Sequence, residues 1–236
     1  MALKRTRASA RGARRLNVAR ESAVARAARA RAIAAGLARA YPDAECALHY
    51  RSPWELVVAT ILSAQCTDAM VNQVTPALFA ELPTPAALGA APPARVEALI
   101  KRTGFFRQKT KAIQATARAV AAEHGGTVPA TMDALTALPG IGRKTANVVL
   151  GTAFGQPAIF VDTHVRRVAG RLGLTFSDDP DTIERDLQQL LPRRGWTVFA
   201  HRLIHHGRRI CVARRPLCST CPVFTWCPQI GVTNPR

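Results

Sequence analysis

Acidic residues are scarce in this sequence. Asp and Glu together number 15 against 33 Lys and Arg in 236 residues, which gives a formal net charge of +18 and an isoelectric point near 11.3. So large an excess of positive charge predicts a polyanionic partner. It favours nucleic acid over an acidic membrane surface.

Long hydrophobic runs are also missing. Although 48% of the residues are hydrophobic, no stretch approaches the roughly 20 apolar residues that a membrane-spanning helix needs. The sequence therefore predicts no membrane partner. No apolar segment follows the basic N-terminus, which argues against a secretory signal. We expect a cytoplasmic, nucleoid-associated protein, with organelle targeting by the basic N-terminus as the alternative.

Strand-like patterning is nearly absent. The one β-like run, Ala158 to Val161, has no second run to pair with, whereas apolar residues elsewhere recur every three to four positions, as in helices. The sequence therefore predicts an all-α protein, with loops at the proline-rich stretches Leu82–Pro85 and Ala91–Pro93. Helices are expected over residues 21–41, 52–64, 67–79, 94–103 and 107–124, and again after positions 143, 162, 183 and 196.

The N-terminal segment carries much of the positive charge. Residues 1–39 hold eleven Lys and Arg against a single acid, which leaves 22 basic and 14 acidic residues in the remainder. Residues 1–21 are rich in Arg, Ala, Ser and Gly, and we predict a basic disordered arm that tethers the protein to DNA. An organelle transit peptide has the same composition and stays the alternative.

The most informative stretch is Leu138-Pro-Gly-Ile-Gly-Arg-Lys-Thr-Ala-Asn147. Its proline and two glycines interrupt a helix, and the glycines permit positive φ and close backbone approach. An apolar turn precedes it, and an apolar stripe at helical spacing follows it. The pattern predicts two helices joined by a tight glycine hairpin. The amides of such a hairpin and the N-terminus of its second helix suit a phosphate oxygen.

Lys144 lies at the start of that second helix, opposite the apolar stripe, so we expect it to face solvent or a cleft. The positive end of the helix dipole and the neighbouring Arg143 both favour its neutral amine. A neutral lysine amine is a nucleophile that can form a Schiff base. On the residues alone, the alternative is that Lys144 only adds positive charge to a phosphate site.

Four cysteines near the C-terminus are separated by six, two and five residues, namely Cys211, Cys218, Cys221 and Cys227. Thiols this close predict a metal site or a disulfide framework, and the lack of an export signal favours metal. Zinc and an iron–sulfur cluster both accept four thiolates, although zinc commonly uses two Cys-x-x-Cys pairs and only one is present. The loop inside the cysteine set carries Arg214 and Arg215, which with Arg208 and Arg209 predict a basic patch for phosphates. The remaining two, Cys46 and Cys66, are predicted to be ordinary buried thiols.

The hairpin sequence, together with Val161-Asp-Thr-His164, resembles the helix-hairpin-helix DNA glycosylases. More narrowly, it is similar to the endonuclease III family of bifunctional glycosylase/AP lyases. The resemblance runs from about Ala38 to Cys227, with the hairpin, lysine, aspartate and cysteine set in the family's order. It implies a 4Fe–4S cluster on the four cysteines. It also implies that the partner is double-stranded DNA with a damaged base or an abasic site, and we expect the chain to act as a monomer.

The resemblance further implies two helical domains. A helical barrel domain with the helix-hairpin-helix would take residues 46–156, and residues 22–45 and 157–236 would form a discontinuous domain that carries the cluster. The DNA cleft, with Lys144 and Asp162, would lie between them. Sequence periodicity by itself does not indicate a discontinuous domain.

The resemblance also implies roles for individual residues. Lys144 would attack the sugar of a flipped nucleotide, displace a damaged, oxidised pyrimidine and form an imine, from which β-elimination cuts the strand. Asp162 would stabilise the positive sugar, although an aspartate before Thr163 is also an ordinary helix N-cap. Gln65 and Phe105 would fill the gap left in the base stack, and since the family often has leucine in place of Phe105, the opposite-base preference stays open. The remaining expected DNA-binding residues are Leu138, Gly140, Gly142, Arg143, Thr145, His164, Arg214 and Arg215.

Two other functions compete with this reading. One is a monofunctional mismatch glycosylase of the same superfamily, of which the adenine-mismatch enzyme shares the hairpin and the cluster but lacks the lysine. The other is a non-catalytic module that binds the DNA backbone through its hairpin. The presence of Lys144 argues against the mismatch enzyme, which lacks this lysine. The pair Lys144 and Asp162 argues against the binding module, because binding the DNA backbone needs neither residue.

Overall fold

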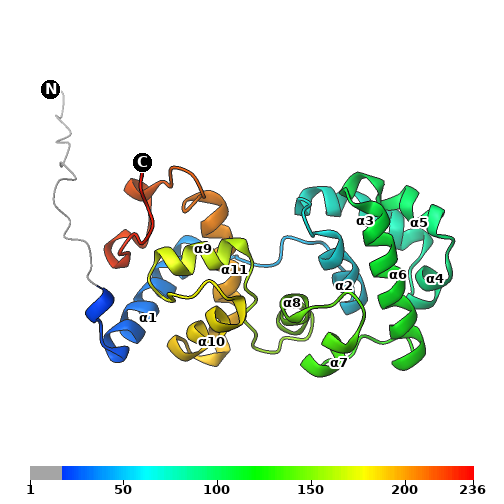
Figure 1. Ribbon diagram of the computed structural model, residues 1–236, viewed down its shortest axis with the longest axis horizontal. Coiled ribbons are helices and arrows are strands. Elements are labelled where there is room, and N and C mark those ends of the chain that lie inside the picture. The colour runs from blue at the N-terminus through cyan, green and yellow to red at the C-terminus, as the bar shows by residue number, and fades with distance from the viewer. Residues whose placement is uncertain (1–17) are drawn as a thin grey trace.

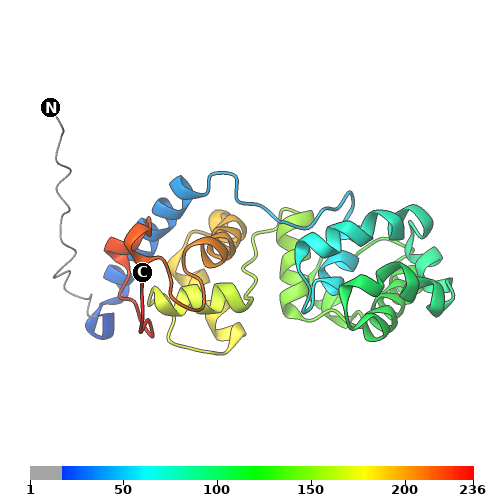
Figure 2. The same cartoon turned by 90° about the horizontal axis from the view of Figure 1, so that it is seen from above.

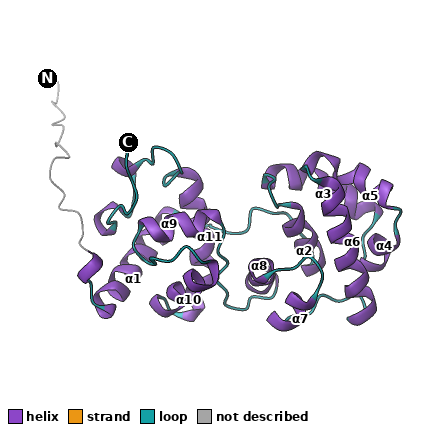
Figure 3. Ribbon diagram, in the orientation of Figure 1, coloured by secondary structure: helices purple, strands orange, loops and turns teal. Residues whose placement is uncertain are grey.

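The computed structural model of this chain describes residues 18–236, which fold into helices joined by turns and loops (Figures 1 and 3). No strand occurs among these residues, and the prediction of an all-α protein is confirmed. The run from Ala158 to Val161 is buried but extended and unpaired. None of the described helices combines the length and the hydrophobicity that a membrane span requires.

The helices form two groups, which both views keep apart (Figures 1 and 2). The chain crosses between the groups twice, in residues 41–52 and 154–162. One group contains α1 (Ala23–Ala40), α9 (Thr163–Arg171), α10 (Pro180–Leu190) and α11 (Trp196–Arg209). The other contains α2 (Pro53–Leu62), α3 (Asp68–Glu81), α4 (Pro85–Ala90), α5 (Pro93–Ile100), α6 (Phe106–Glu123), α7 (Met132–Ala137) and α8 (Arg143–Ala153).

The core of the α2–α8 group is built around α2. Ser52 caps this helix by accepting a hydrogen bond from the Glu55 amide at 3.2 Å, and Pro53 takes the first helical position. All residues from Trp54 to Leu62 are buried, so α2 is a fully covered central helix. Its neighbours α3, α6 and α8 bury their apolar faces against the same core.

The second group joins both ends of the described chain. Apolar residues of α1, including Ile33 and Leu37, share one buried cluster with residues of α9, α10 and α11. Arg29 of α1 is buried, and its guanidinium donates to the carbonyls of Leu172 at 2.5 Å and Gly173 at 2.9 Å. A segment near the N-terminus therefore belongs to the same core as segments 140 residues further on. The domain limits at 46–156, and at 22–45 with 157–236, stay a prediction.

Two expectations about local structure were wrong. The proline-rich stretch after Leu82 contains a six-residue helix, α4, because Pro85 sits at its first position and the Thr84 hydroxyl caps the Ala87 amide at 3.1 Å. At the N-terminus, residues 18–20 form a 3-10 helix and Glu21 pairs with Arg29 at 2.8 Å, so this end of the predicted arm is ordered. The rest of the predicted arm, residues 1–17, lies outside the described part of the chain.

Candidate active site and DNA interface

The predicted hairpin joins α7 to α8. Gly140 has φ +82°, a conformation that favours glycine, whereas Gly142 is extended with φ −91° and forms the N-cap position of α8. The hydroxyl of Thr116 on α6 donates to the Pro139 carbonyl at 2.6 Å and ties the hairpin to the α2–α8 core. Leu138 is 2% exposed. Its side chain is therefore buried in the α2–α8 core, and its expected role in DNA binding stays a prediction.

Lys144 and Asp162 open into one cleft of about 460 Å³ between the two groups of helices. Lys144 is exposed at the start of α8, as predicted from the apolar stripe on the other side of that helix. Asp162 precedes α9, and its carboxylate accepts a hydrogen bond from the Val165 amide at 2.7 Å. Asp162 therefore both caps α9 and lines the cleft of Lys144, because the hydrogen bond to the Val165 amide fixes the position of its carboxylate.

A narrower recess of about 70 Å³ continues inward from the cleft, and both Lys144 and Asp162 line it. Its inner wall includes Thr60 of α2, Phe160 and His201 of α11. Burial lowers the pKa of His201 to about 4, so its ring is neutral near pH 7. The recess therefore combines this neutral ring with the charged side chains of Lys144, Asp162, Asp68 and Arg208.

Arg143 is not a free cation on the hairpin. Its guanidinium forms a two-bond pair with the buried carboxylate of Glu184 on α10, at 2.8 and 2.9 Å, and Asp181 lies 3.7 Å away. Asn147 donates to the same Glu184 carboxylate at 2.9 Å. These contacts link α8 to the other helical group. The side chain expected to contact DNA thus holds the hairpin against α10, and 46% of it stays exposed.

Three of the expected DNA contacts lie at strained backbone positions. Gln65, Phe105 and Arg215 have φ of +50°, +47° and +53°, and Gln229 is the other non-glycine residue with positive φ in the described chain. Such conformations cost free energy and cluster at functional sites. Gln65 is exposed in the cleft of Lys144, whereas Phe105 is 59% exposed at the start of α6 and lines none of the walls described above.

The remaining expected contacts divide between the cleft and the C-terminal loop. His164 lines the cleft, where burial lowers its pKa and Arg167 lies 3.1 Å from its Nδ1 atom. Thr145 follows Lys144 on α8 and is half-buried, and Arg214 and Arg215 are both exposed. Arg208, expected to belong to a basic patch, pairs instead with Asp68 at 2.7 Å.

The four C-terminal cysteines are all partly buried and lie near one another. Burial, followed by the nearness of the other three thiols, raises the pKa of Cys221 to about 12. Burial likewise raises the pKa of Cys227 to about 11. Four thiolates held this close need a cationic group between them, and Arg171, 3.5 Å from the Cys211 sulfur, adds further positive charge. The donor set therefore fits a metal group. No three metal-binding side chains of the described chain come close enough together to form an ion site, and the choice between zinc and an iron–sulfur cluster rests on the resemblance.

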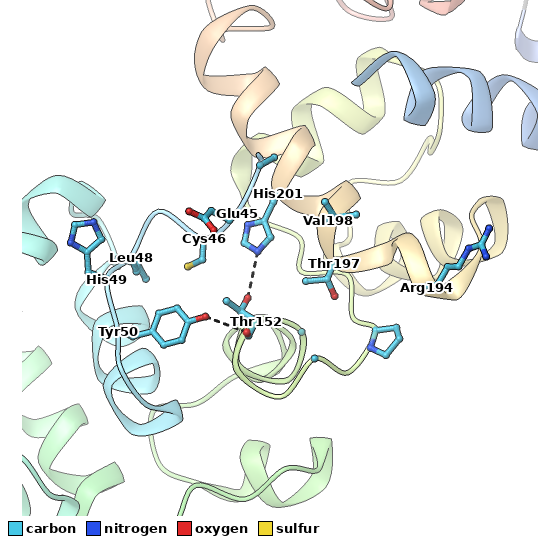
Figure 4. Close-up of a pocket in the computed structure, with 14 residues that line it drawn as sticks. Glu45, Cys46, Leu48, His49, Tyr50, Thr152, Arg194, Thr197, Val198 and His201 are labelled. Carbon is cyan, nitrogen blue, oxygen red and sulfur yellow. Dashed lines mark hydrogen bonds between the residues drawn. The ribbon is translucent and has the colours of Figure 1, made fainter. Parts of the chain in front are cut away.

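A second cavity, of about 660 Å³, lies behind the recess and shares Cys46 and His201 with it (Figure 4). Here Tyr50 donates to the Thr152 carbonyl at 3.2 Å, and His201 lies 3.5 Å from the Thr152 hydroxyl. These contacts connect α8 to the connection at residues 41–52 and to α11.

Sequence reasoning missed several residues of this site. Thr60, Asp68 and His201 line the recess, and so does Cys46, which was expected to be an ordinary buried thiol. The signal for Thr60 was present, since it is the single hydroxyl-bearing residue in the apolar helix α2. His201 and Asp68 carried no comparable signal, because their neighbours in the cleft are far away in sequence.

Comparison with known proteins places this geometry in a family. The model of the HhH-GPD superfamily of base excision DNA repair proteins matches residues 58–193. Endonuclease III of Synechocystis is 52% identical over 82% of this chain and 89% of its own length, and that of Bacillus subtilis is 47% identical over 80% and 87%. A solved non-covalent endonuclease III–DNA complex superposes with a TM-score of 0.82, at 43% identity, covering 85% of this chain and 94% of the solved chain.

A second solved structure bears on the chemistry. It is a trapped covalent intermediate of endonuclease III with DNA, and it matches at a TM-score of 0.82 with 42% identity, covering 85% of this chain and 95% of that one. The hairpin, the cleft and the cysteine set therefore occur here in a chain that is 40–52% identical to several proteins named endonuclease III. This chain belongs to the helix-hairpin-helix superfamily of base excision DNA repair proteins and, within it, to the endonuclease III family of bifunctional DNA glycosylase/AP lyases.

Proposed function

We propose that this enzyme removes oxidised pyrimidine bases from double-stranded DNA, with Lys144 as its nucleophile and Asp162 as its electrostatic partner. The observation that carries the proposal is that these two side chains, from different helical groups, open into one cleft and line one recess. A module that only binds the DNA backbone does not need an exposed lysine and a capped carboxylate facing the same space.

The chemistry follows from the two groups. The neutral Nζ of Lys144 attacks C1′ of the extruded nucleotide, the bond from C1′ to the base breaks, and the base leaves with the bonding electrons and takes up a proton. As C1′ becomes electron-poor, the fixed carboxylate of Asp162 stabilises the positive charge. Its cap hydrogen bond to the Val165 amide holds it in place, so little reorganisation is needed during the reaction.

Strand cleavage continues from the same covalent link. Opening of the sugar ring gives an imine between Lys144 and C1′, which makes the protons on C2′ acidic. Loss of one such proton and departure of the 3′ phosphate oxygen cut the strand by β-elimination. Water then releases the lysine. The recess behind Lys144, with its neutral His201, is the place for the base edge before this sequence begins.

The cofactor that fits this chain best is a 4Fe–4S cluster held by Cys211, Cys218, Cys221 and Cys227. When bound, such a cluster supplies cationic metal to four thiolates and pins the loop between them. That loop presents Arg214 and Arg215 to solvent, and we assign it phosphate binding. Arg171 holds the start of the loop by donating to the Val212 carbonyl at 2.7 Å and the Ala213 carbonyl at 2.8 Å.

The working form that we propose is a monomer on nucleoid DNA in the cytoplasm. The net charge of +18 supports the DNA partner, because neutralising phosphates is the main source of affinity for DNA. The exposed hairpin and cleft lie on the two helical groups of one chain, so a single copy supplies every group that the reaction uses.

The test is borohydride trapping. Reduction of the imine joins protein and DNA permanently, so the unsubstituted chain is expected to yield a protein–DNA product with a duplex carrying an oxidised pyrimidine. Lys144→Gln keeps length and polarity but removes the nucleophile, and both trapping and strand cleavage should vanish while DNA with an abasic site still binds. Lys111→Gln, an exposed lysine change on α6, is the matched control and should trap normally. Trapping by Lys144→Gln would show that the nucleophile lies elsewhere.

A further inference from the structure

One buried lysine takes no part in the chemistry described above. Lys109 of α6 is 5% exposed, and its ammonium group donates a hydrogen bond to the Thr103 carbonyl at 2.8 Å. Burial lowers the pKa of Lys109, and the Cys66 thiol opposes this shift, but within the described chain no carboxylate acts on the lysine. Lys109 therefore carries a buried positive charge without an acidic partner.

A buried ammonium group without a counter-ion is destabilising, because the charge loses its water and gains no opposite charge. The same face of α6 also buries Ile113, Ala117 and Val120, and an apolar residue in place of Lys109 would avoid this cost. Lysine differs from such a residue in having a hydrogen-bond donor at the end of a long apolar stem. The role of Lys109 therefore depends on the carbonyl that its ammonium group binds.

That carbonyl directly precedes a strained and exposed segment. Gly104 has φ +69° and Phe105 has φ +47°. Phe105 is 59% exposed, and it occupies the N-cap position of α6 without a capping hydrogen bond from its side chain. A positive φ at a bulky residue costs free energy and persists only where the surrounding contacts enforce it. The exposed position of the Phe105 ring therefore requires contacts that fix residues 104 and 105.

Lys109 supplies such contacts on both sides of Phe105. Its backbone amide donates to the Phe105 carbonyl at 3.0 Å, and its ammonium group binds the Thr103 carbonyl. Thr103 is 2% exposed, and its hydroxyl donates to the Ile100 carbonyl at 2.8 Å. Two buried anchor points, Thr103 and Lys109, therefore lie on either side of the exposed segment and are bonded to each other.

We propose that Lys109 is a positioning residue for Phe105, and that its ammonium group holds residues 104 and 105 in the conformation that directs the aromatic ring towards the base stack. The predicted role of Phe105 is to fill the gap left by the extruded nucleotide, so the inference rests on the proposed function. Lys109 is too buried to contact DNA and acts through Phe105. Its contribution therefore belongs to extrusion of the nucleotide and not to the chemistry at C1′.

The experiment measures single-turnover base release by Lys109→Met, which keeps the length of the side chain but removes its donor and its charge. Two duplexes carry the same oxidised pyrimidine, opposite its normal partner base or opposite an abasic analogue, where no base pair has to break. Release from the paired lesion should slow about tenfold, the change that loss of one charge-assisted hydrogen bond produces. Release from the unpaired lesion should slow by at most about twofold, because extrusion of an unpaired base costs less.

A double-mutant cycle separates positioning from a general loss of structure. Phe105→Ala should slow release from the paired lesion, and Lys109→Met should have no further effect in the Phe105→Ala background, because no ring is left to position. Lys111→Met changes an exposed lysine of the same helix and should leave both rates unchanged. Borohydride trapping on abasic DNA counts the active molecules in each preparation, so that unfolded protein does not enter the rates. If Lys109→Met yields no active protein, Lys109→Gln serves in the same cycle.

The outcomes are distinct. An unchanged rate on the paired lesion, equal slowing on the two duplexes, or additive effects of Lys109→Met and Phe105→Ala would overturn the positioning role and leave the lyase assignment intact. Failure of the unsubstituted chain to trap abasic DNA would overturn the proposed function, and the positioning role with it.

Discussion

The two groups of helices that meet at the cleft are stabilised in different ways. The α2–α8 group, which carries Lys144, is organised around a helix whose residues Trp54–Leu62 are all buried. The group that carries Asp162 has a smaller apolar core, and after Arg209 its chain contains only short 3-10 helices, with Val223 and Val232 as buried aliphatic side chains. Lys144 therefore belongs to a group of helices that apolar packing stabilises. Asp162 belongs to a group in which apolar packing is less extensive and other interactions must contribute.

That other support is largely polar. Arginine side chains on α1 and α9 donate to backbone carbonyls of the loops that surround them, including Arg29 to Gly173, Arg167 to Cys211 and Arg171 to Val212. The four cysteines lie in the same loops. A buried loop carbonyl without a hydrogen bond is destabilising. These arginines supply the hydrogen bonds that a helix or a sheet would otherwise provide, and they fix the conformation of the loops. We therefore expect substitutions in the two groups of helices to differ in their effects on stability and on catalysis.

The largest expected effect comes from removing the charge that the second group contributes. Asp162→Asn keeps the shape and nearly all of the capping strength, but it removes the carboxylate that stabilises positive charge at the sugar. Base release should slow by about a hundredfold to a thousandfold, and the melting temperature should change little. Single-turnover kinetics with an oxidised pyrimidine duplex measure the rate.

A matched control separates charge from capping. Asp179→Asn alters the N-cap of α10, where the carboxylate accepts the Thr182 amide at 2.8 Å outside the cleft. This variant should release base at the normal rate. If Asp179→Asn is as slow as Asp162→Asn, the effect of the latter is structural, and the two groups do not share the chemistry as we infer.

The next largest effect is expected when a cysteine of the second group is replaced, because this group depends on the cysteine loop and the α2–α8 group does not. Cys218→Ser removes one ligand of the proposed cluster, so iron should fall from about four per chain, the content of one 4Fe–4S cluster. Amide hydrogen exchange should then speed up across residues 210–236 while α2 keeps its protection, because its core is apolar and distant. Cys66→Ser, outside the cysteine set, should keep its iron. Stoichiometric zinc without iron in anaerobically prepared protein would contradict the cluster.

A smaller effect concerns the contact between the groups and depends on pH. His201 of α11 packs edge-on against Phe160 at 4.8 Å between ring centres and lies beside Thr152 of α8. Its pKa in the folded chain is about 4, below the usual 6.5 of the unfolded chain. The unfolded state therefore takes up the proton first, so the contribution of the neutral ring is complete above about pH 6.5 and is lost as pH falls towards 4.

The loss should reach about 2 to 3 kcal/mol between pH 7 and pH 4.5, at about 1.4 kcal/mol for each unit of pKa difference. Urea unfolding at the two pH values measures it. His201→Gln cannot titrate and should reduce the pH dependence by that amount, even if it is less stable at both values. An identical pH dependence in the two proteins would show that His201 does not join the groups in the neutral form.

The smallest effect involves neither group's core. Removal of residues 1–17 deletes six Lys and Arg and no acid, and it leaves the ordered residues from Val18 onward in place. If this segment binds phosphates, the slope of log K against log salt for undamaged DNA should become shallower by up to about five. Replacing the six residues by Gln in the full-length chain is the control for length. An unchanged slope would favour a targeting role for the segment.

Much of the fold followed from sequence because local signals agreed with one another. The capping residue Ser52, apolar periodicity and the helix-breaking hairpin predicted most helices close to their observed limits. The helix α4 was missed because a proline at a first helical position looks the same in sequence as a proline in a loop. The resemblance, and not periodicity, indicated that the second group draws on both ends of the chain.

By itself, the sequence determined the all-α class, the exposed position of Lys144, the capping role of Asp162 and the clustering of four cysteines, because each depends on residues within about twenty positions of one another. Only the tertiary structure decided the partners that lie far apart along the chain. It paired Arg143 with Glu184, 41 residues away, and so gave this residue a link between the helical groups that its position in the sequence does not indicate. It also brought His201 of α11 to the recess that Lys144 lines. Local spacing says which face of a helix a side chain occupies, but what meets that face depends on how distant segments pack.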